Sequence, residues 1–283
     1  MSEFPRTTVE NLSLSRMIIG TNWFFGWSHT SAAKDKCIRE TLNTTGKIAD
    51  IIEVFLNAGV DTLMGLIEHP GMKEAITEAE NRTGRKVIVV STPGFNVGDD
   101  TQALGEAERT IERNAKLGVA ICMPHTSATD KLHDHRARKI LNMDKYCAMI
   151  RKYGMIPGLS THVPESVVYA DETGLDVGTY IQIYNAAGFL MHLEVDWVHR
   201  IIWNAKHPVM TIKPMAAGRL LPLVGLGFSW GTLRDRDMVT VGTMSPDEAR
   251  EVIDISLACL EHRESNVELQ RTRSKDTVCP RKT

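Results

Sequence analysis

The sequence predicts an α/β fold, a (β/α)8 or TIM barrel, formed by a single domain over residues 1–283. Three observations lead to this prediction. Short β-rich runs alternate with helical patterns along most of the chain. Eight such units fit into roughly 250 residues, which is the usual size of this barrel. No GxGxxG fingerprint follows the first run, whereas an open doubly wound sheet that binds a dinucleotide usually carries one.

Eight segments have the composition of buried parallel strands, because they are short, apolar and bounded by glycine, proline or polar residues. In chain order they are residues 16–22, 60–65, 86–92, 119–123, 155–161, 179–185, 208–213 and 238–243.

Apolar residues spaced three and four positions apart predict helices between these strands. The helical stripes run over residues 48–55, 72–79, 104–111, 146–153, 195–202 and 249–260. The last helix has the clearest start, because Ser245 fits the N-cap, Pro246 the first helical position and Glu248 the third position of a capping box. Residues 264–283 are polar and charged, which predicts a flexible C-terminal tail.

Composition limits the classes of partner. The formal net charge of −2 gives no electrostatic reason to expect nucleic acid. The N-terminus lacks the apolar core of a signal peptide, and no apolar run approaches the roughly 18 residues of a membrane helix. Five cysteines without a CxxC pair indicate reduced thiols. We therefore expect a cytoplasmic protein with a small-molecule substrate and no nucleic-acid or membrane partner; a homo-oligomer is left open.

The catalytic candidates are His125, His162 and Lys213, which follow the fourth, fifth and seventh predicted strands. In a TIM barrel the active site lies at the C-terminal ends of the strands, so these side chains share one rim. Alternation along each strand predicts that Lys213 and Gln182 point inward, while the neighbouring isoleucines face the helices. The same reasoning turns Ser160 and His162 inward and Leu159 outward.

Two kinds of chemistry fit these candidates. The metal-ligand candidates are Glu68, His69, His125 and His162, which could supply the N/O ligands of a catalytic Zn²⁺ or a similar divalent ion. The alternative is a group of hydrogen-bonded polar residues at the barrel mouth. Lys213 could bind a substrate carboxylate or phosphate, which we favour, or form a Schiff base, or simply pair with a carboxylate.

Two further segments carry chemistry-bearing side chains. Residues 130–139, DKLHDHRARK, could bind a metal, but a solvated loop or helix face is favoured. The aromatic residues Trp23, Phe24, Phe25 and Trp27 fit either the wall of a substrate pocket or packing that closes one end of the barrel.

Several segments, taken in order, resemble the aldo/keto reductases, most closely the branch with a Ser-Thr-His motif after the fifth strand. They are GLSTHVPESV, YIQIYN, IKPMAAGRL and VGTMSPDEAREV. The resemblance covers roughly residues 12–262 and implies a TIM barrel. Of the family's catalytic tetrad, only the histidine has a counterpart, at His125. The aspartate position falls on Met64, the lysine position falls on Pro93, and no tyrosine follows.

The resemblance also implies an NADP site. Its cofactor-binding candidates are Gln182, Asn185, Pro214, Gly218, Arg219 and Ser245. A helix that starts at Ser245 favours anions through its free N–H groups, whereas Asp247 and Glu248 would repel them. The alternative is that these residues only cap the helix. No iron–sulfur cluster is implied, because the tail carries a single cysteine, Cys279.

Three functions fit this sequence. The first is a small-molecule enzyme centred on His125, His162 and Lys213, with metal-assisted carbonyl polarisation or water activation as one version. The second is an NADP-dependent carbonyl reductase in which His125 replaces the tyrosine as proton donor. The third is a non-catalytic binding or assembly barrel. We favour the first, because the polar rim is kept while most of the tetrad is missing; the reaction class is left open.

Overall fold

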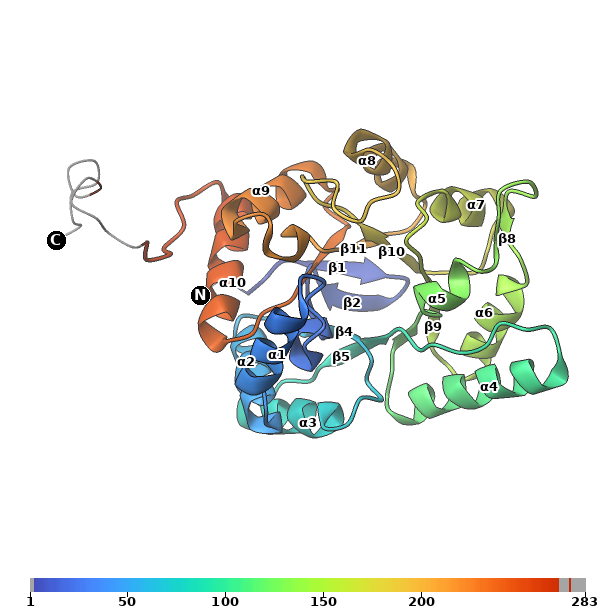
Figure 1. Cartoon of the computed structure of the whole chain (residues 1–283), viewed down its shortest axis with the longest axis horizontal. Helices are drawn as coiled ribbons and strands as arrows, with labels where there is room; N and C mark the ends of the chain where they lie inside the picture. Colours follow the sequence, from blue (N-terminus) through green and yellow to red (C-terminus); the bar gives the residue numbers. More distant parts are fainter. Residues whose placement is uncertain (1–2, 270–274, 276–283) are drawn as a thin grey trace.

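A computed structural model describes residues 3–269 and 275 of the chain. Eight parallel strands form a closed barrel with helices around it (Figure 1). The barrel strands are β3 (Met17–Gly20), β4 (Thr62–Gly65), β5 (Ile88–Ser91), β6 (Ile121–Cys122), β9 (Ile156–Ser160), β10 (Thr179–Ile183), β11 (Val209–Ile212) and β12 (Met238–Val241). This confirms the predicted fold class and all eight predicted strands.

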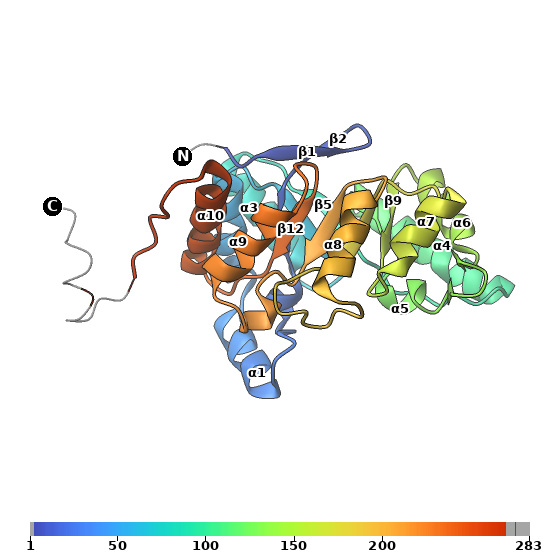
Figure 2. The ribbon, with the colours of Figure 1, turned by 90° about the horizontal axis from the view of Figure 1, so that it is seen from above.

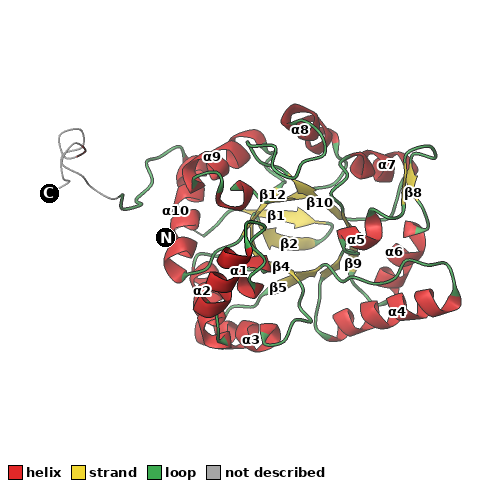
Figure 3. Cartoon of the chain, in the orientation of Figure 1, coloured by secondary structure: helices red, strands yellow, loops and turns green. Residues whose placement is uncertain are grey.

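The helices lie outside the ring of strands (Figure 3). They are α1 (Ala32–Thr41), α2 (Thr45–Asn57), α3 (Met72–Thr83), α4 (Thr101–Lys116), α5 (Thr126–Thr129), α6 (Met143–Lys152), α7 (Glu165–Thr173), α8 (Val195–Asn204), α9 (Pro222–Thr232) and α10 (Pro246–Glu261). The capping box of α10 forms as predicted, because Ser245 Oγ accepts from Glu248 N at 3.1 Å and Glu248 Oε2 accepts from Met244 N at 2.8 Å.

The barrel closes where β12 pairs with β3, through the register Val239–Met17, Thr240–Ile18 and Val241–Ile19. A buried polar group stabilises the base of this seam. The Arg234 guanidinium donates to both carboxylate oxygens of the fully buried Asp237, at 2.8 and 2.7 Å. Arg16 Nε, next to the start of β3, donates to the Asp237 carbonyl at 3.1 Å. The first and last strands are therefore joined by side chains as well as by the sheet.

Apolar side chains fill the lower barrel. Ile18, Met64, Val90, Ile121, Met123, Ile181, Met210 and Met238 form one buried cluster. An N-terminal hairpin of β1 (Arg6–Val9) and β2 (Leu12–Ser15) adds Val9 and Leu14 to the same cluster. Figure 2 shows this hairpin over one end of the barrel, while α1 projects from the other end. The N-terminal end of the barrel is thus plugged.

The strand alternation predicted for β10 and β11 is wrong. Ile181 and Met210 point into the barrel, and the neighbouring Tyr180 and Val209 pack in the outer cluster between sheet and helices. The reason is that a TIM barrel interior is a packed apolar core, so isoleucine and methionine are buried there in preference to glutamine. For β9 the prediction is confirmed, since Leu159 packs outward.

Helix α9 was not predicted, because its glycines weaken the helical pattern. One of these glycines is required by packing. A Cβ on Gly225 would lie 2.6 Å from the Pro214 carbonyl oxygen and 3.1 Å from Met215 Cα. Helix α9 therefore rests directly on the backbone that follows β11.

Other predictions concern the surface and the tail. In the described part of the chain, Cys37, Cys122, Cys147 and Cys259 are unpaired, while Cys279 lies outside it. Most of the tail predicted over 264–283 also lies outside the described residues. None of the described helices has both the length and the apolar character that crossing a membrane requires.

Two glycine substitutions in α9 should have opposite effects. Gly225→Ala should lower the free energy of unfolding by about 1–3 kcal/mol, because the new methyl group meets backbone that cannot move aside easily. Gly231→Ala should raise it by about 0.5–1 kcal/mol, because no atom lies within 4 Å of the new Cβ and alanine favours helix. Urea unfolding of both variants tests this; a stabilised Gly225→Ala variant would contradict the packing.

Candidate functional site

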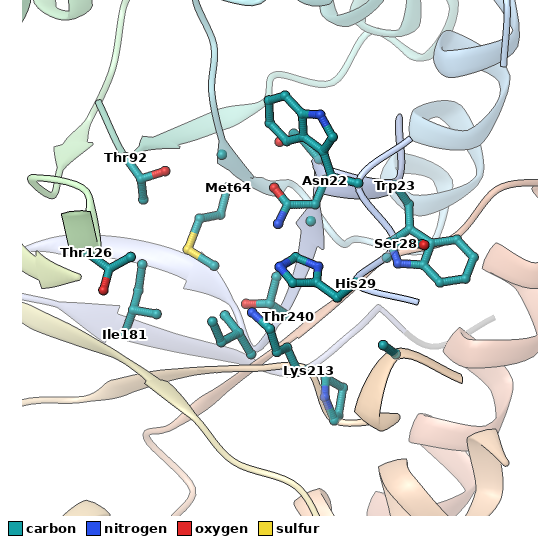
Figure 4. Close-up of a pocket in the computed structure, with 18 of the residues that line it drawn as sticks. Asn22, Trp23, Ser28, His29, Met64, Thr92, Thr126, Ile181, Lys213 and Thr240 are labelled. Carbon is teal, nitrogen blue, oxygen red and sulfur yellow. The ribbon is translucent and has the colours of Figure 1, made fainter. Parts of the chain in front are cut away.

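A cavity of about 310 Å³ opens at the C-terminal ends of the strands. Its apolar walls include Trp23, Trp27, Met64, Ile181 and Ile212. Its polar lining comprises Thr21, Asn22, Ser28, His29, Thr92, His125, Thr126, Ser160, His162, Lys213 and Thr240. Figure 4 shows Asn22, His29 and Lys213 pointing into the same space, with Met64 opposite them. The catalytic candidates His125, His162 and Lys213 are therefore brought together around one cavity.

Lys213 enters this cavity through an unusual backbone conformation. Ile212, the last residue of β11, already lines the cavity, so simple alternation would turn Lys213 outward. The backbone of Lys213 is left-handed, with φ of 61°, and this breaks the alternation. Ala216 and Ala217 are left-handed as well, with φ of 49° and 56°. The loop after β11 thus keeps three non-glycine residues in a conformation that L-residues seldom adopt.

The Lys213 ammonium has no acidic partner. The cavity lining contains no aspartate or glutamate, and the Lys213 ammonium forms no ion pair or hydrogen bond within the described part of the chain. Burial lowers the pKa of Lys213 to about 8. A buried charge without a partner is costly, so the neutral amine is far more populated near physiological pH than in an ordinary lysine, although the ammonium remains the main form at pH 7.

Three imidazoles face the same charge from three different loops. His29 lies in the loop between β3 and α1, His125 is the N-cap of α5, and His162 follows β9. Burial and then the positive charge of Lys213 lower the pKa of His29. Burial also lowers the pKa of His125, and it lowers that of His162 to about 4. The three rings are therefore mainly neutral at pH 7.

The tautomer of His125 follows from its hydrogen bonds. The Ser127 backbone N–H can only donate, and it lies 3.2 Å from His125 Nδ1. Nδ1 therefore accepts, and the neutral ring carries its proton on Nε2. His125 is thus a proton donor through Nε2, while its Nδ1 caps α5.

Asp130 joins the loops that carry the two histidines. Its carboxylate accepts from Thr126 Oγ1 at 2.5 Å and from Thr161 Oγ1 at 2.6 Å, and the His162 backbone N–H donates to it at 3.3 Å. The negative charge raises the pKa of His125 and His162, but by less than burial lowers it. Asp130 therefore positions both loops without protonating the rings.

Two buried hydroxyl groups at the cavity lack a partner. Thr21 Oγ1 and Thr240 Oγ1 have no hydrogen-bond partner among the described residues, and both side chains are at least nine-tenths buried. Gly65 makes room for Thr21, because a Cβ there would lie 1.8 Å from Thr21 Oγ1. Buried polar groups are nearly always hydrogen-bonded, so these two hydroxyls are exceptions to that rule beside the cavity.

The predicted metal-ligand set is not assembled. Glu68 accepts from Asn114 Nδ2 at 2.8 Å, and the His69 ring stacks on Phe25 with centroids 3.7 Å apart. Neither lines the cavity with His125 and His162. Over the described residues there is no group of three or more His, Cys, Asp or Glu side chains that could hold a metal ion. Glu68 and His69 do not join the two cavity histidines, because they already contact Asn114 and Phe25, respectively.

Most of the side chains predicted to contact NADP already have partners within the protein. Gln182 Nε2 donates to the Ile181 carbonyl at 2.9 Å, and Asn185 bonds the Phe189 backbone at both ends of its amide. The Arg219 guanidinium lies over the Phe189 ring at 4.0 Å from the centroid. Ser245 and the Glu248 carboxylate cap α10. Only Pro214 and Gly218 of this set line the cavity. These residues do not fit a cofactor phosphate at α10.

The remaining candidate segments have structural roles or line the wall. Residues 130–139 include the hairpin of β7 (His133–Asp134) and β8 (Lys139–Ile140), where His133 Nδ1 bonds Ser166 Oγ at 2.8 Å. Both alternatives for the aromatic run hold: Trp23 and Trp27 line the cavity, and Phe24 and Phe25 pack in the core.

Sequence reasoning missed part of the cavity lining. Thr21, Asn22 and Ser28 precede His29 in the loop after β3, and Thr240 comes from β12. The sequence offered one signal, since a TIM barrel builds its site from all eight strand ends. Ser28 and His29 follow an aromatic run without any periodicity that would orient them.

Comparison with known proteins agrees with the fold. No family model and no curated protein matches the sequence. Among solved structures, a Pseudomonas aeruginosa protein described as an aldo-keto reductase shares 15% identity, with TM-score 0.65 and coverage of 90% of this chain and 94% of that one. An aldo/keto reductase from Brucella melitensis shares 14%, with TM-score 0.59 and coverage of 90% and 93%. Aldose reductase from Giardia lamblia shares 12%, with TM-score 0.52 and coverage of 94% and 90%.

These similarities show that the chain shares the (β/α)8 barrel fold of these solved structures. At such identities they describe the fold and leave the chemistry to be argued from the site.

Lys213→Met should stabilise the protein at neutral pH. In the folded chain the pKa of Lys213 is about 8, whereas the unfolded chain has an ordinary lysine, so at pH 7 the buried ammonium costs folding free energy. Removing the charge should raise the free energy of unfolding at pH 7 by about 3 kcal/mol, from about 1.4 kcal/mol per pKa unit. Urea unfolding at pH 7 measures this gain.

The gain should shrink as pH rises above about 8 towards the ordinary lysine pKa of about 10.4, because the folded wild type then loses its proton before the unfolded chain does. Lys116→Met, on the surface of α4 beside Glu112, should give no comparable gain. A Lys213→Met variant less stable than wild type at pH 7 would show that the ammonium has a favourable partner.

Proposed function

We propose that the chain is an enzyme that converts a small carbonyl compound in the cavity, with Lys213, His125 and His162 as its catalytic residues. One observation carries this proposal: the Lys213 amine lies in a cavity without carboxylates and is faced by imidazoles that are mainly neutral. A nitrogen held in this way is available for a substrate rather than for a structural ion pair.

Each of the three side chains has a separate role in the proposed carbonyl chemistry. The Lys213 ammonium polarises the carbonyl group by stabilising negative charge on its oxygen, and the apolar walls strengthen this effect by lowering the local dielectric. His125 donates the proton on Nε2 to an oxygen that becomes negative. The neutral ring of His162 accepts a proton from the substrate. Proton donor and acceptor thus come from neighbouring strands β6 and β9.

The lining indicates the substrate class. A cavity of about 310 Å³ is at the small end of ligand sites. Apart from Lys213 and the imidazoles, it is lined by hydroxyl, amide and apolar groups. This favours a short, hydroxylated aldehyde or ketone. Solved structures of the same fold are described as aldo-keto reductases, and the proposed substrate shares the carbonyl group in that description.

The other functions have less support. The reductase version lacks the tyrosine and lysine of the family, and Met64 lines the cavity where the aspartate would fall. The metal-assisted version lacks its ligand set, whereas Lys213 already supplies positive charge. A binding barrel would not need a proton donor and a proton acceptor beside an unpaired amine.

The His125 side chain should be required for turnover. We expect His125→Asn to lower kcat by about 10²–10⁴-fold, because asparagine keeps an acceptor for the cap of α5 but removes the Nε2 proton. Conversion of a panel of short hydroxylated aldehydes and ketones, followed by proton NMR, measures this loss. His262→Asn, at the exposed left-handed C-cap of α10, is the matched control and should leave kcat unchanged.

Equal rates for His125→Asn and wild type would remove His125 from the mechanism. Conversion that requires added NADPH would instead support the reductase function.

The pH dependence should reflect the lowered imidazole pKa values. Because burial lowers the pKa of His162 to about 4, its ring stays neutral well below the ordinary value of about 6.5, and burial shifts the pKa of His125 in the same direction. If Lys213 acts by its charge, we expect turnover to persist near pH 5.5 and to fall as pH drops through about 4, whereas a mechanism that uses the neutral Lys213 amine would lose turnover below about pH 8. Circular dichroism at each pH shows that the fold remains. A midpoint near 6.5 would contradict the buried environment.

A further inference from the structure

We propose that Lys213 acts as a nucleophile and forms an imine with the carbonyl carbon of a short, uncharged, hydroxylated aldehyde or ketone. This inference rests on the proposed function and states how the carbonyl group is activated: by a covalent bond to the protein rather than by charge alone.

The first argument is that the amine is free and fixed in place. Several exposed lysines of the chain form ion pairs with carboxylates, such as Lys86 with Glu80 and Lys152 with Glu108, both at 2.6 Å, whereas Lys213 is buried in the cavity. In the described part of the chain, Lys213 has no such partner. Its backbone is held by the left-handed loop after β11 and by α9, which packs on the Pro214 carbonyl through Gly225.

The second argument is electrostatic. His29, His125 and His162 face Lys213 from the loops after β3, β6 and β9, and the positive charge of Lys213 lowers the pKa of each ring. Asp130 lies behind His125 and His162, outside the lining, and Asp35 is bonded to Ser28 at 2.6 Å. No carboxylate therefore holds the proton on Lys213, and a neutral amine is the nucleophilic form.

The chemistry balances with the groups present. The nitrogen lone pair attacks the carbonyl carbon, a C–N bond forms, and the π pair moves to the oxygen, which takes the Nε2 proton of His125. The nitrogen gives a proton to a neutral imidazole, His29 or His162. The C–O bond then breaks as the oxygen leaves as water with the proton held by that imidazole, and a C=N bond forms. The remaining N–H proton returns to His125 Nε2, so that both rings are neutral again. Carbonyl compound and amine thus give imine and water, with no oxidant or reductant.

The third argument concerns the guest. The side chains of Asn22, Thr92 and Thr126 line the cavity, and they can exchange hydrogen bonds with substrate hydroxyl groups. Once Lys213 is bonded to carbon, the lining offers no lysine or arginine for a phosphate or carboxylate group. An uncharged polyhydroxy carbonyl compound therefore fits better than an anionic one.

The imine also indicates the reaction type. A protonated imine draws electrons from the bond next to the former carbonyl carbon, so that a C–H or C–C bond there breaks more easily. The neutral ring of His162 can accept the proton released from that carbon. This places the enzyme among lyases or isomerases that pass through a carbanion next to a carbonyl group.

Reductive trapping tests the imine directly. The full chain is incubated at pH 7.5 with dihydroxyacetone or glyceraldehyde and sodium cyanoborohydride, which adds hydride to the C=N carbon and makes the bond permanent. Peptide mass mapping should find the adduct on Lys213 with at least about a tenfold excess over the average surface lysine, because surface lysines are almost fully protonated at this pH. Lys213→Arg should abolish this adduct, and Lys116→Arg should keep it.

Trapping spread over surface lysines without an excess on Lys213 would overturn the proposal, and this result needs no variant. Exchange of the substrate proton next to the carbonyl group, measured by NMR in D₂O, provides a second readout that Lys213→Arg should abolish. If Lys213→Arg still converts substrate and no adduct forms, the imine is wrong but the proposed function stands, with Lys213 acting by charge. If the wild type neither converts nor traps any of these probes, the proposed function fails as well.

Discussion

The parallel pairing of β12 with β3 is the constraint on which the molecule depends, because it turns an open sheet into a closed barrel. Arg16 and Arg234, both bonded to Asp237, hold this seam at its base. Closure gives the strands one shared interior, where apolar side chains and the N-terminal hairpin fill the lower part. The strand ends cannot be filled in this way, since each continues into a loop, and the cavity lies there.

Much of the fold could be predicted from sequence because strands and helices differ in period and glycine ends several of the helices. The side of each strand could not be predicted for β10 and β11. A parallel strand buried on both faces has apolar residues on each, so alternation does not say which face is inside. Gln182 and Ile181 were interchanged for this reason. Lys213 was placed correctly for a wrong reason, since its left-handed backbone, and not its parity, turns it inward.

The candidate site was partly predictable for a related reason. His125, His162 and Lys213 follow strand ends, and the barrel brings all strand ends together. Glu68 and His69 also follow a strand, but local partners bind them elsewhere, and no sequence pattern showed that. Apolar Met64 of β4 lines the cavity, and the unpaired ammonium of Lys213 enters it from the end of the seventh barrel strand, β11.

The hairpin of β1 and β2 limits where a substrate can enter the barrel and where a product can leave it. By filling the lower end with Val9 and Leu14, it leaves the cavity at the opposite end of the barrel, among the loops that follow the strands. The product must therefore leave through the same end of the barrel by which the reactant enters. Two molecules of reactant size would compete for a cavity of about 310 Å³. A reaction between two partners would therefore be stepwise, and the first fragment would remain bound while its co-product leaves.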